Sequence, residues 1–163
     1  MPGFPTINGL DYSFSSVQFS ADAIPFLLPG LKSANYDDGL KPSEARGTNA
    51  QVTSRGRGPY NAKGSLEFWK SQWVAARRAL VSASTAAGFP GGIKQFEFDF
   101  VASYFETAVG LTTDYCLRCR ITDESEGHSE DGAVLIHKCD LHIIQINWDG
   151  QIPFDTALLP ASE

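Results

Sequence analysis

Apolar and polar residues alternate along much of this chain, and a period of two predicts β-strands. The clearest case is residues 61–68, where Ala62, Leu66 and Phe68 share one side, while Asn61, Lys63, Ser65 and Glu67 occupy the other. The same period predicts further strands over residues 11–21, 24–37, 95–105, 112–122 and 134–147.

One segment instead has a helical period directly after the strand 61–68. Its apolar residues recur at spacings of three and four: Trp69, Trp73, Ala76, Leu80, Ala83 and Ala87. Gly88 and Pro90 predict the end of this helix. Aromatic residues concentrate in the alternating runs, and this is the single convincing helical pattern. The chain is therefore predicted to be mainly β with one packed helix.

Segments 112–122 and 134–147 predict a long antiparallel hairpin with an acidic, solvated tip between them. Strict alternation places the first set on the core face: Tyr115, Leu117, Cys119, Ile121, Leu135, His137, Cys139, Leu141 and Ile143. It places the second set on the opposite face: Cys116, Arg118, Arg120, Lys138, Asp140 and His142.

Residues 40–60 contain two prolines and three glycines with almost no bulky apolar side chain. Asp37, Asp38 and Gly39 just before them indicate a turn. A connection of this length inside a compact domain is normally functional or disordered. We expect these residues to form an extended loop that orders only against neighbouring subunits.

The chain has 163 residues, which fits one domain over 1–163, with residues 151–163 forming a C-terminal arm. No run approaches the length of a membrane span, and the first residues lack signal-peptide character, so we expect a cytosolic site of folding. Its net charge of -6 argues against a protein that grips nucleic acid through phosphates, because that task needs clustered basic residues.

Cysteine and histidine residues raise the question of a zinc site: Cys116, Cys119, His137, Cys139 and His142. In a regular strand, Cys116 and Cys119 point to opposite faces, so they cannot converge on one ion unless a bulge intervenes. Cys119, His137 and Cys139 share a face that is otherwise apolar. We therefore expect buried cysteines, no metal and no cofactor.

Catalytic motifs are absent from the sequence. There is no Gly-x-Ser-x-Gly elbow, and the glycines near Arg55 and Arg57 lack both a preceding strand and the Walker lysine. The chain is therefore not expected to be an enzyme.

The order of several motifs resembles the tail tube proteins of tailed bacteriophages and related contractile injection systems. These motifs are Gly9-Leu-Asp-Tyr12, the strand Leu31 to Tyr36, the Arg- and Gly-rich loop ending in Arg57-Gly-Pro-Tyr60, the strand running into a Trp-containing helix, and Asn147-Trp-Asp-Gly150. The likeness covers most of the chain.

This resemblance implies a β-sandwich or barrel of two antiparallel sheets, with one flanking α-helix and a long extended inter-subunit loop. It also implies a structural protein whose hexameric rings stack into a hollow tube for the passage of phage DNA, without specific DNA binding or a membrane. Expected partners are further tail proteins, namely a sheath if the tail is contractile, the baseplate and the terminator. The expected location is the virion tail, assembled in the bacterial host cytoplasm.

Two sets of residues are assigned roles on this basis. The subunit interface is expected to include Arg46, Arg55, Arg57, Pro59 and Tyr60. The channel is expected to be lined by Lys63, Ser65, Glu67, Arg118, Arg120, Lys138, Asp140 and His142. Two alternatives stay open: a tube of the type VI (Hcp-like) or extracellular injection kind, and a monomeric β-sandwich binding module.

Overall fold

The computed structural model of the chain describes residues 6–8, 10–11, 17–22, 24, 31–41, 43–46, 52–56, 60–90, 92–128 and 135–151. The elements in chain order are β1 Thr6–Ile7, β2 Leu10–Asp11, β3 Val17–Ala21, β4 Leu31–Leu40, β5 Ser43–Arg46, β6 Val52–Gly56, β7 Tyr60–Trp69, α1 Lys70–Ala86, β8 Phe98–Glu106, β9 Gly110–His128, β10 Leu135–Ile143 and β11 Gln145–Asn147. A mainly β chain with one helix is thus confirmed for the described residues.

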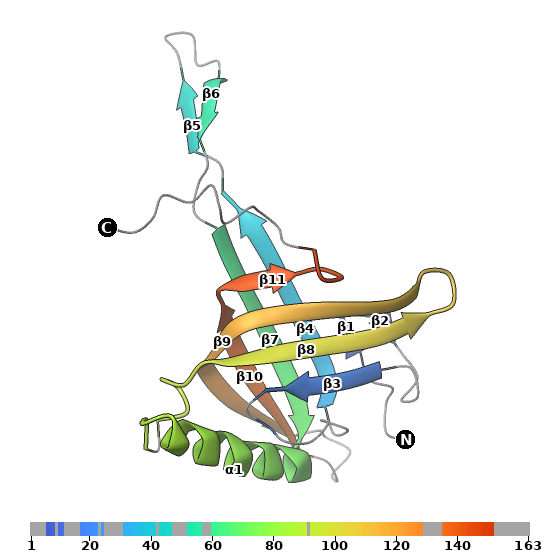
Figure 1. The fold of residues 1–163 in the computed structure, drawn as a ribbon, viewed down its shortest axis with the longest axis vertical. Helices are drawn as coiled ribbons and strands as arrows, with labels where there is room; N and C mark the ends of the chain where they lie inside the picture. The colour runs from blue at the N-terminus through green and yellow to red at the C-terminus, as the bar shows by residue number, and fades with distance from the viewer. Residues whose placement is uncertain are drawn as a thin grey trace.

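The main sheet has the strand order β2-β1-β4-β7-β10-β9-β8-β3, and β11 pairs with β9 beside this path. Its described pairs are antiparallel except β1 with β4, which is parallel and departs from the expected all-antiparallel pattern. β9 belongs to two halves of the sheet: its first part pairs with β8 and its last part with β10. Figure 1 shows β9 turning from the layer of β8 and β3 toward that of β10 and β7.

Two irregularities accompany this turn of β9. Phe98 pairs with Cys119 and Phe100 with Cys116, so β9 carries one extra residue there. A second register shift lies between Asp140 and Leu141 of β10, where Thr122 is the extra residue on β9. Such bulges bend a strand and increase its local twist. They allow one continuous strand to serve both halves.

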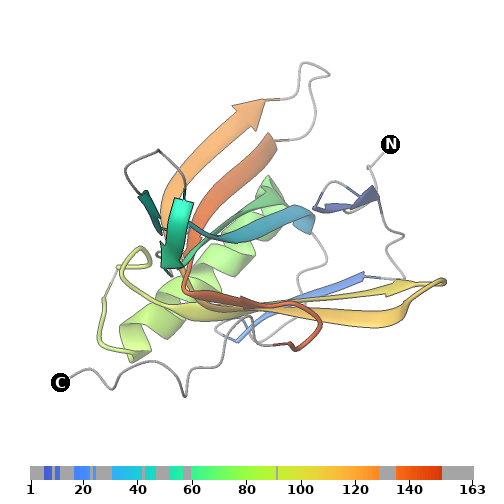
Figure 2. The same cartoon turned by 90° about the horizontal axis from the view of Figure 1, so that it is seen from above.

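Apolar residues from the two halves and from α1 meet in one core. Phe100 comes from β8, Leu66 from β7, and Leu80 from α1, and all three are buried. Trp73 of α1 packs against Phe68 with ring centroids 5.3 Å apart, so the helix covers the inner side of β7. Figure 2 shows α1 beneath β7 and β10, with the β8 and β9 layer to one side.

The helix starts directly after β7 and ends where glycine was expected to end it. Gly88 has a φ of 91°, which favours glycine, and Phe89 donates its N–H to the Ser84 carbonyl at 2.8 Å. The buried stripe is Trp73, Ala76, Leu80 and Ser84. The predicted continuation through Ala87 is wrong, since Ala87 is exposed beyond the last helical turn. No helix among the described residues is long and apolar enough to span a membrane.

Three boundaries differ from the expectations. Asp37 and Gly39 do not form a turn, because β4 continues through them to Leu40 and pairs with β7 along this length. Part of the 40–60 loop is itself paired, since β5 and β6 form a separate two-stranded sheet. Glu124 and Glu126 belong to β9 rather than to a hairpin tip.

Candidate functional site: a polar sheet face and a projecting arm

Most of the residues predicted to line a channel lie on one face of the sheet. In the register of β7, β10 and β9, Lys138 lies opposite Glu67, Asp140 opposite Ser65, and His142 opposite both Lys63 and Arg120. Opposed residues of neighbouring strands point to the same side. The other face carries the core residues, so the predicted separation of polar and core faces is correct for these seven residues: Lys63, Ser65, Glu67, Arg120, Lys138, Asp140 and His142.

β4 extends this polar face beyond the residues expected from the sequence. Asn35 pairs with Ser65 and Asp37 with Lys63, and both β4 side chains are exposed. Their alternation with Ala34 and Tyr36 is visible in the sequence. The predicted strand 24–37 contains both residues, but its pairing with β7 is long-range and was not predicted. We call the eight residues Asn35, Asp37, Lys63, Ser65, Glu67, Lys138, Asp140 and His142 the polar face.

Opposite charges alternate across the polar face. The Lys63 Nζ lies 3.9 Å from the Asp37 Oδ2, and the Lys138 Nζ lies 3.5 Å from the Asp140 Oδ1. At the edge of the face, the Lys32 Nζ lies 3.8 Å from the Glu67 Oε2. Such exposed pairs contribute only about 0.2 to 1 kcal/mol each. Their effect is to keep this surface hydrated without a strong net charge of either sign.

A hollow of about 620 Å³ lies on this side of the sheet. Its lining combines the residue after β1 with residues of β4, β7, β9 and β10: Asn8, Asn35, Tyr36, Asp37, Lys63, Gly64, Ser65, Thr122, Asp140 and Leu141. Gly64 can contribute only backbone to this side, since its register partners Tyr36 and Leu141 belong to the core face. The lining of the hollow includes both polar and apolar groups.

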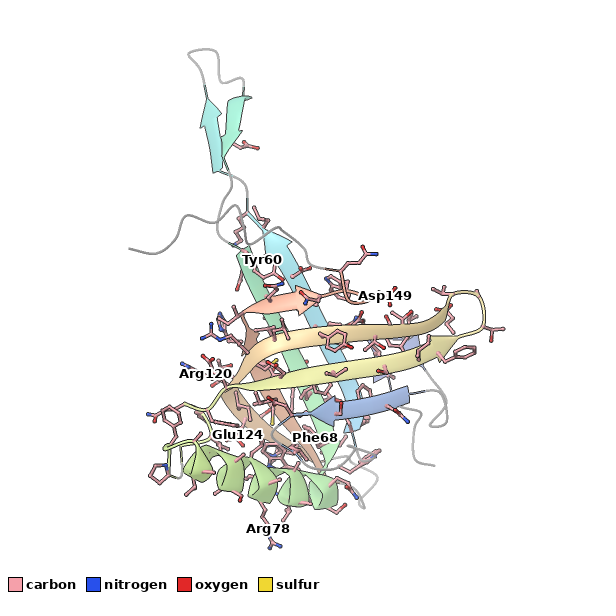
Figure 3. The ribbon with its side chains drawn as sticks, in the orientation of Figure 1. Tyr60, Phe68, Arg78, Arg120, Glu124 and Asp149 are labelled. Carbon is pink, nitrogen blue, oxygen red and sulfur yellow. The ribbon has the colours of Figure 1, made fainter. Side chains whose placement is uncertain are left out.

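Arg118, another predicted channel residue, has no register partner among the described strand pairs and binds the same carboxylate as Arg120. It lies at the bulge of β9 with a φ of 54°, and its Nε lies 2.9 Å from Glu97 Oε2. Arg120 Nη2 lies 2.9 Å from the other oxygen of Glu97. These arginines lower the pKa of Glu97, principally through the hydrogen bond from Arg118. Figure 3 shows Arg120 directed outward.

Two of the predicted interface residues lie in the arm formed by β5 and β6, which projects beyond the ends of β4 and β7 (Figure 1). Arg46 is the last residue of β5, and Arg55 lies in β6 opposite Glu44. Arg57 and Pro59 lie outside the described residues. The structure therefore places two of these residues by their backbone.

Tyr60, the fifth predicted interface residue, is held within its own subunit. Its hydroxyl donates to Asp38 Oδ2 at 2.9 Å and accepts the Ile146 N–H at 3.1 Å. Burial, the largest cause, and the Asp38 carboxylate raise the pKa of Tyr60 to about 12. Trp148 donates to the same Asp38 carboxylate at 3.1 Å. The base of the arm is thus joined to the β11 region.

The cysteines differ in part from the predicted arrangement. The bulge at Arg118 turns both Cys116 and Cys119 inward, and the Cys119 thiol donates to the Cys116 carbonyl at 3.3 Å. The assignment of Cys116 to the outer face is wrong because the extra residue reverses the alternation. For the same reason Tyr115 is exposed and Leu117 half-buried. All three cysteines are free and buried, as expected.

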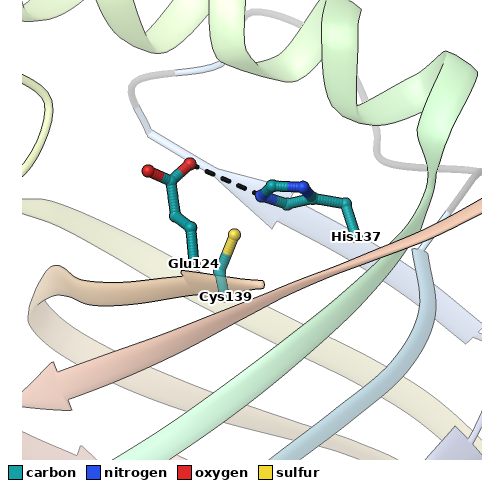
Figure 4. A group of neighbouring side chains, drawn as sticks. All are labelled: Glu124, His137 and Cys139. Carbon is teal, nitrogen blue, oxygen red and sulfur yellow. Dashed lines mark ion pairs between the residues drawn. The ribbon is translucent and has the colours of Figure 1, made fainter. Parts of the chain in front are cut away.

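A different group of metal-binding residue types converges beneath α1 (Figure 4). Glu124 of β9 and Cys139 of β10 are register partners, and His137 lies two residues before Cys139 on the same face. One potential ligand atom from each lies within 4.8 Å of the other two. The sequence analysis considered only cysteines and histidines as zinc ligands, so it did not include Glu124. Its position opposite Cys139 depends on the register shift at Thr122.

The chain was compared with known proteins. No protein-family model matches it, and no curated protein matches it in sequence. Solved structures do match. A chain of the PVC extracellular contractile injection system, from its sheath-tube complex in the extended state, has a TM-score of 0.53 at 12% identity, with 82% of this chain and 87% of that chain covered.

Two further solved structures match this chain with comparable TM-scores. The SPP1 tail tube has a TM-score of 0.55 at 16% identity, over 87% of this chain and 80% of that chain. A chain from the virion of a native gene transfer agent particle has a TM-score of 0.51 at 12% identity, over 82% and 95%. This chain therefore has the fold of tail tube proteins.

Proposed function

We propose that this chain is a structural tube subunit whose hexameric rings stack into a hollow tube for the passage of DNA, rather than an enzyme. The observation that carries the proposal is the arm of β5 and β6. Its two strands form a sheet of their own and are not paired with the main sheet. An isolated two-stranded hairpin is at best marginally stable in water. Seating on a neighbouring subunit would supply the missing contacts.

The polar face supports the second part of the proposal, a channel lining. A surface that faces DNA must stay wet and must not accumulate positive charge, because clustered lysine and arginine bind phosphates tightly. Basic and acidic side chains alternate on the polar face, as in the pair Lys63 and Asp37. We infer that DNA slides past such a lining without sticking, and that Arg120 extends it along β9.

Partners and location follow from the same proposal. The PVC chain of similar fold comes from a sheath-tube complex, and the gene transfer agent chain comes from a virion. We infer that this chain contacts other tail proteins, namely a baseplate, a terminator and, in a contractile tail, a sheath. We place the assembled protein in the tail of a virion, built in the host cytoplasm.

A second candidate is the tube of an extracellular contractile injection system, which the match to the PVC complex favours. Such a tube would have the same ring geometry. A monomeric binding module is the third possibility. It would leave the arm without a partner.

Imaging of the purified protein separates these possibilities. At high concentration, negative-stain electron microscopy should show rings or tubes, and light scattering should give the mass of a hexamer. A monomer at every concentration would reject the tube. A cryo-EM map of the tube should place Lys63, Lys138 and His142 on the inner wall. Their position on the outer wall would reject the channel assignment while leaving the tube intact.

A further inference from the structure

The antiparallel pairing of β9 and β10 brings an oxygen, a nitrogen and a sulfur ligand together under α1. The potential ligand atoms of Glu124, His137 and Cys139 lie within 4.8 Å of one another (Figure 4). Zinc in proteins is bound by these three ligand types at about 2.0 to 2.3 Å. Small side-chain adjustments therefore suffice for all three to reach one ion.

His137 is oriented as a metal ligand would be. Its Nδ1 lies 3.4 Å from the Glu126 Oε1, and Glu126 is itself paired with Lys70. Its Nε2 lies 3.4 Å from the Glu124 Oε1. Metal-binding histidines usually donate the N–H of the other ring nitrogen to a carboxylate, which fixes the tautomer. Glu126 is placed to accept that bond.

The Nε2 atom of His137 is the unpartnered group at this cluster. His137 is 6% exposed, and its buried Nε2 has no hydrogen-bond partner among the described residues. With the proton on Nδ1, the Nε2 lone pair faces a carboxylate oxygen, and two acceptors repel each other. A cation between them removes this conflict.

Neighbouring residues hold the imidazole ring of His137 in place and leave the cluster accessible to solvent. Trp73 stacks on His137 with centroids 4.4 Å apart and an interplanar angle of 10°. A groove of about 450 Å³ runs between α1 and β10, and its lining includes Lys70, Arg77 and His137. Water can therefore approach the cluster from the groove.

We propose that Glu124, His137 and Cys139 bind one zinc ion through Oε1, Nε2 and Sγ, with a water molecule as the fourth ligand. The Cys139 thiol releases its proton to solvent when the Zn–S bond forms, and no electron is transferred. The glutamate and thiolate charges together balance the charge of the ion. The site would join β9 to β10 directly under α1. The sequence-based expectation of no metal considered cysteines and histidines without Glu124.

Metal titration of the full-length purified chain, kept reduced with a phosphine, tests the proposal. Zinc should displace a chromophoric chelator with a stoichiometry of one per chain. Cobalt should give a thiolate-to-cobalt charge-transfer band. Cys139→Ala should abolish that band. Glu126→Gln, which weakens the acceptor for His137 Nδ1 and removes the ion pair with Lys70, should weaken zinc binding by about 10- to 100-fold.

Cys116→Ala is the matched control, because Cys116 is also buried but lies outside the cluster, and it should bind zinc as the unmodified chain does. Circular dichroism checks that each variant folds. If Cys139→Ala does not fold, Glu124→Gln carries the test, because the amide keeps the shape of the half-buried carboxylate. Absence of zinc uptake in the unmodified chain, or equal uptake by folded Cys139→Ala or Glu124→Gln, overturns the proposal.

Discussion

Asp114 joins four separate parts of the chain through one buried carboxylate. Its Oδ2 accepts the hydroxyl of Tyr36 at 2.6 Å and that of Tyr104 at 3.1 Å. Its Oδ1 accepts the N–H of Asp149 at 2.9 Å. Burial, followed by the hydrogen bond to Asp114, raises the pKa of Tyr36 far above its ordinary value. β4, β8, β9 and the turn after β11 thus depend on one side chain.

Asp114→Ala should lower the free energy of unfolding by about 3 kcal/mol, because it leaves the buried Tyr36 hydroxyl without its acceptor. Urea denaturation measures this loss. Asp123→Ala is the control, since Asp123 is an exposed aspartate of the same strand. Its effect should stay within about 0.5 kcal/mol. Equal losses in the two variants would contradict the role assigned to Asp114.

Tyr60 should make stability depend on alkaline pH. Its folded-state pKa of about 12 exceeds the unfolded value of about 10. The folded chain therefore holds the phenolic proton more tightly, so this contribution is complete below about pH 10 and is lost as the pH rises toward 12. Denaturation over this range should show the decline. A Tyr60→Phe chain with an equally steep decline would refute the assignment.

At the scale of elements, the alternating pattern predicted β7 well because no bulge interrupts its polar and apolar sides. The same pattern failed in β9 before Arg118, at Tyr115, Cys116 and Leu117, because one extra residue reverses which side chains point inward. A bulge held by the Asp99 carboxylate, which accepts the Arg118 N–H at 2.8 Å, has no signal in local periodicity. The cluster around Cys139 could not be predicted for the same reason, since a second bulge sets the register.

The absence of a side chain at Gly64 lets β7 pack closely against residues of β4 and β10. A Cβ on Gly64 would lie 3.0 Å from the Asn35 carbonyl oxygen and 3.1 Å from Ile143 Cδ1. Gly64→Ala should therefore destabilise the chain by about 1 to 3 kcal/mol, as overpacking does. Gly39→Ala in β4 meets nothing within 4 Å and should be nearly neutral. Thermal unfolding of both variants checks this, and a neutral Gly64→Ala would disprove the tight contact.

At the scale of the whole molecule, the arm of β5 and β6 should be needed for assembly and dispensable for folding. Deletion of residues 43–54 removes most of both strands and leaves every strand of the main sheet. The shortened chain should keep its circular dichroism spectrum and give a monomer in light scattering. Tubes of normal length from this variant would show that the arm does not join subunits.

The structure of the arm could be predicted from the sequence only in part. Its lack of bulky apolar residues excluded it from the predicted core. The same lack hid the pairing of Val52 with Arg46 and of Arg55 with Glu44, because backbone hydrogen bonds need no apolar pattern. The tail-tube fold came from the order of several weak motifs, which together constrain topology more than any one of them.

The shared strand β9 has a consequence for how the molecule comes apart. One continuous run of 19 residues supplies ladder hydrogen bonds to both halves of the main sheet. Neither half can open without loosening the other, so the body should melt as one cooperative unit. β5 and β6 pair with each other alone and share no ladder bond with β9. The arm is thus thermodynamically independent of the body that carries it, free to open and reclose while the rest stays folded.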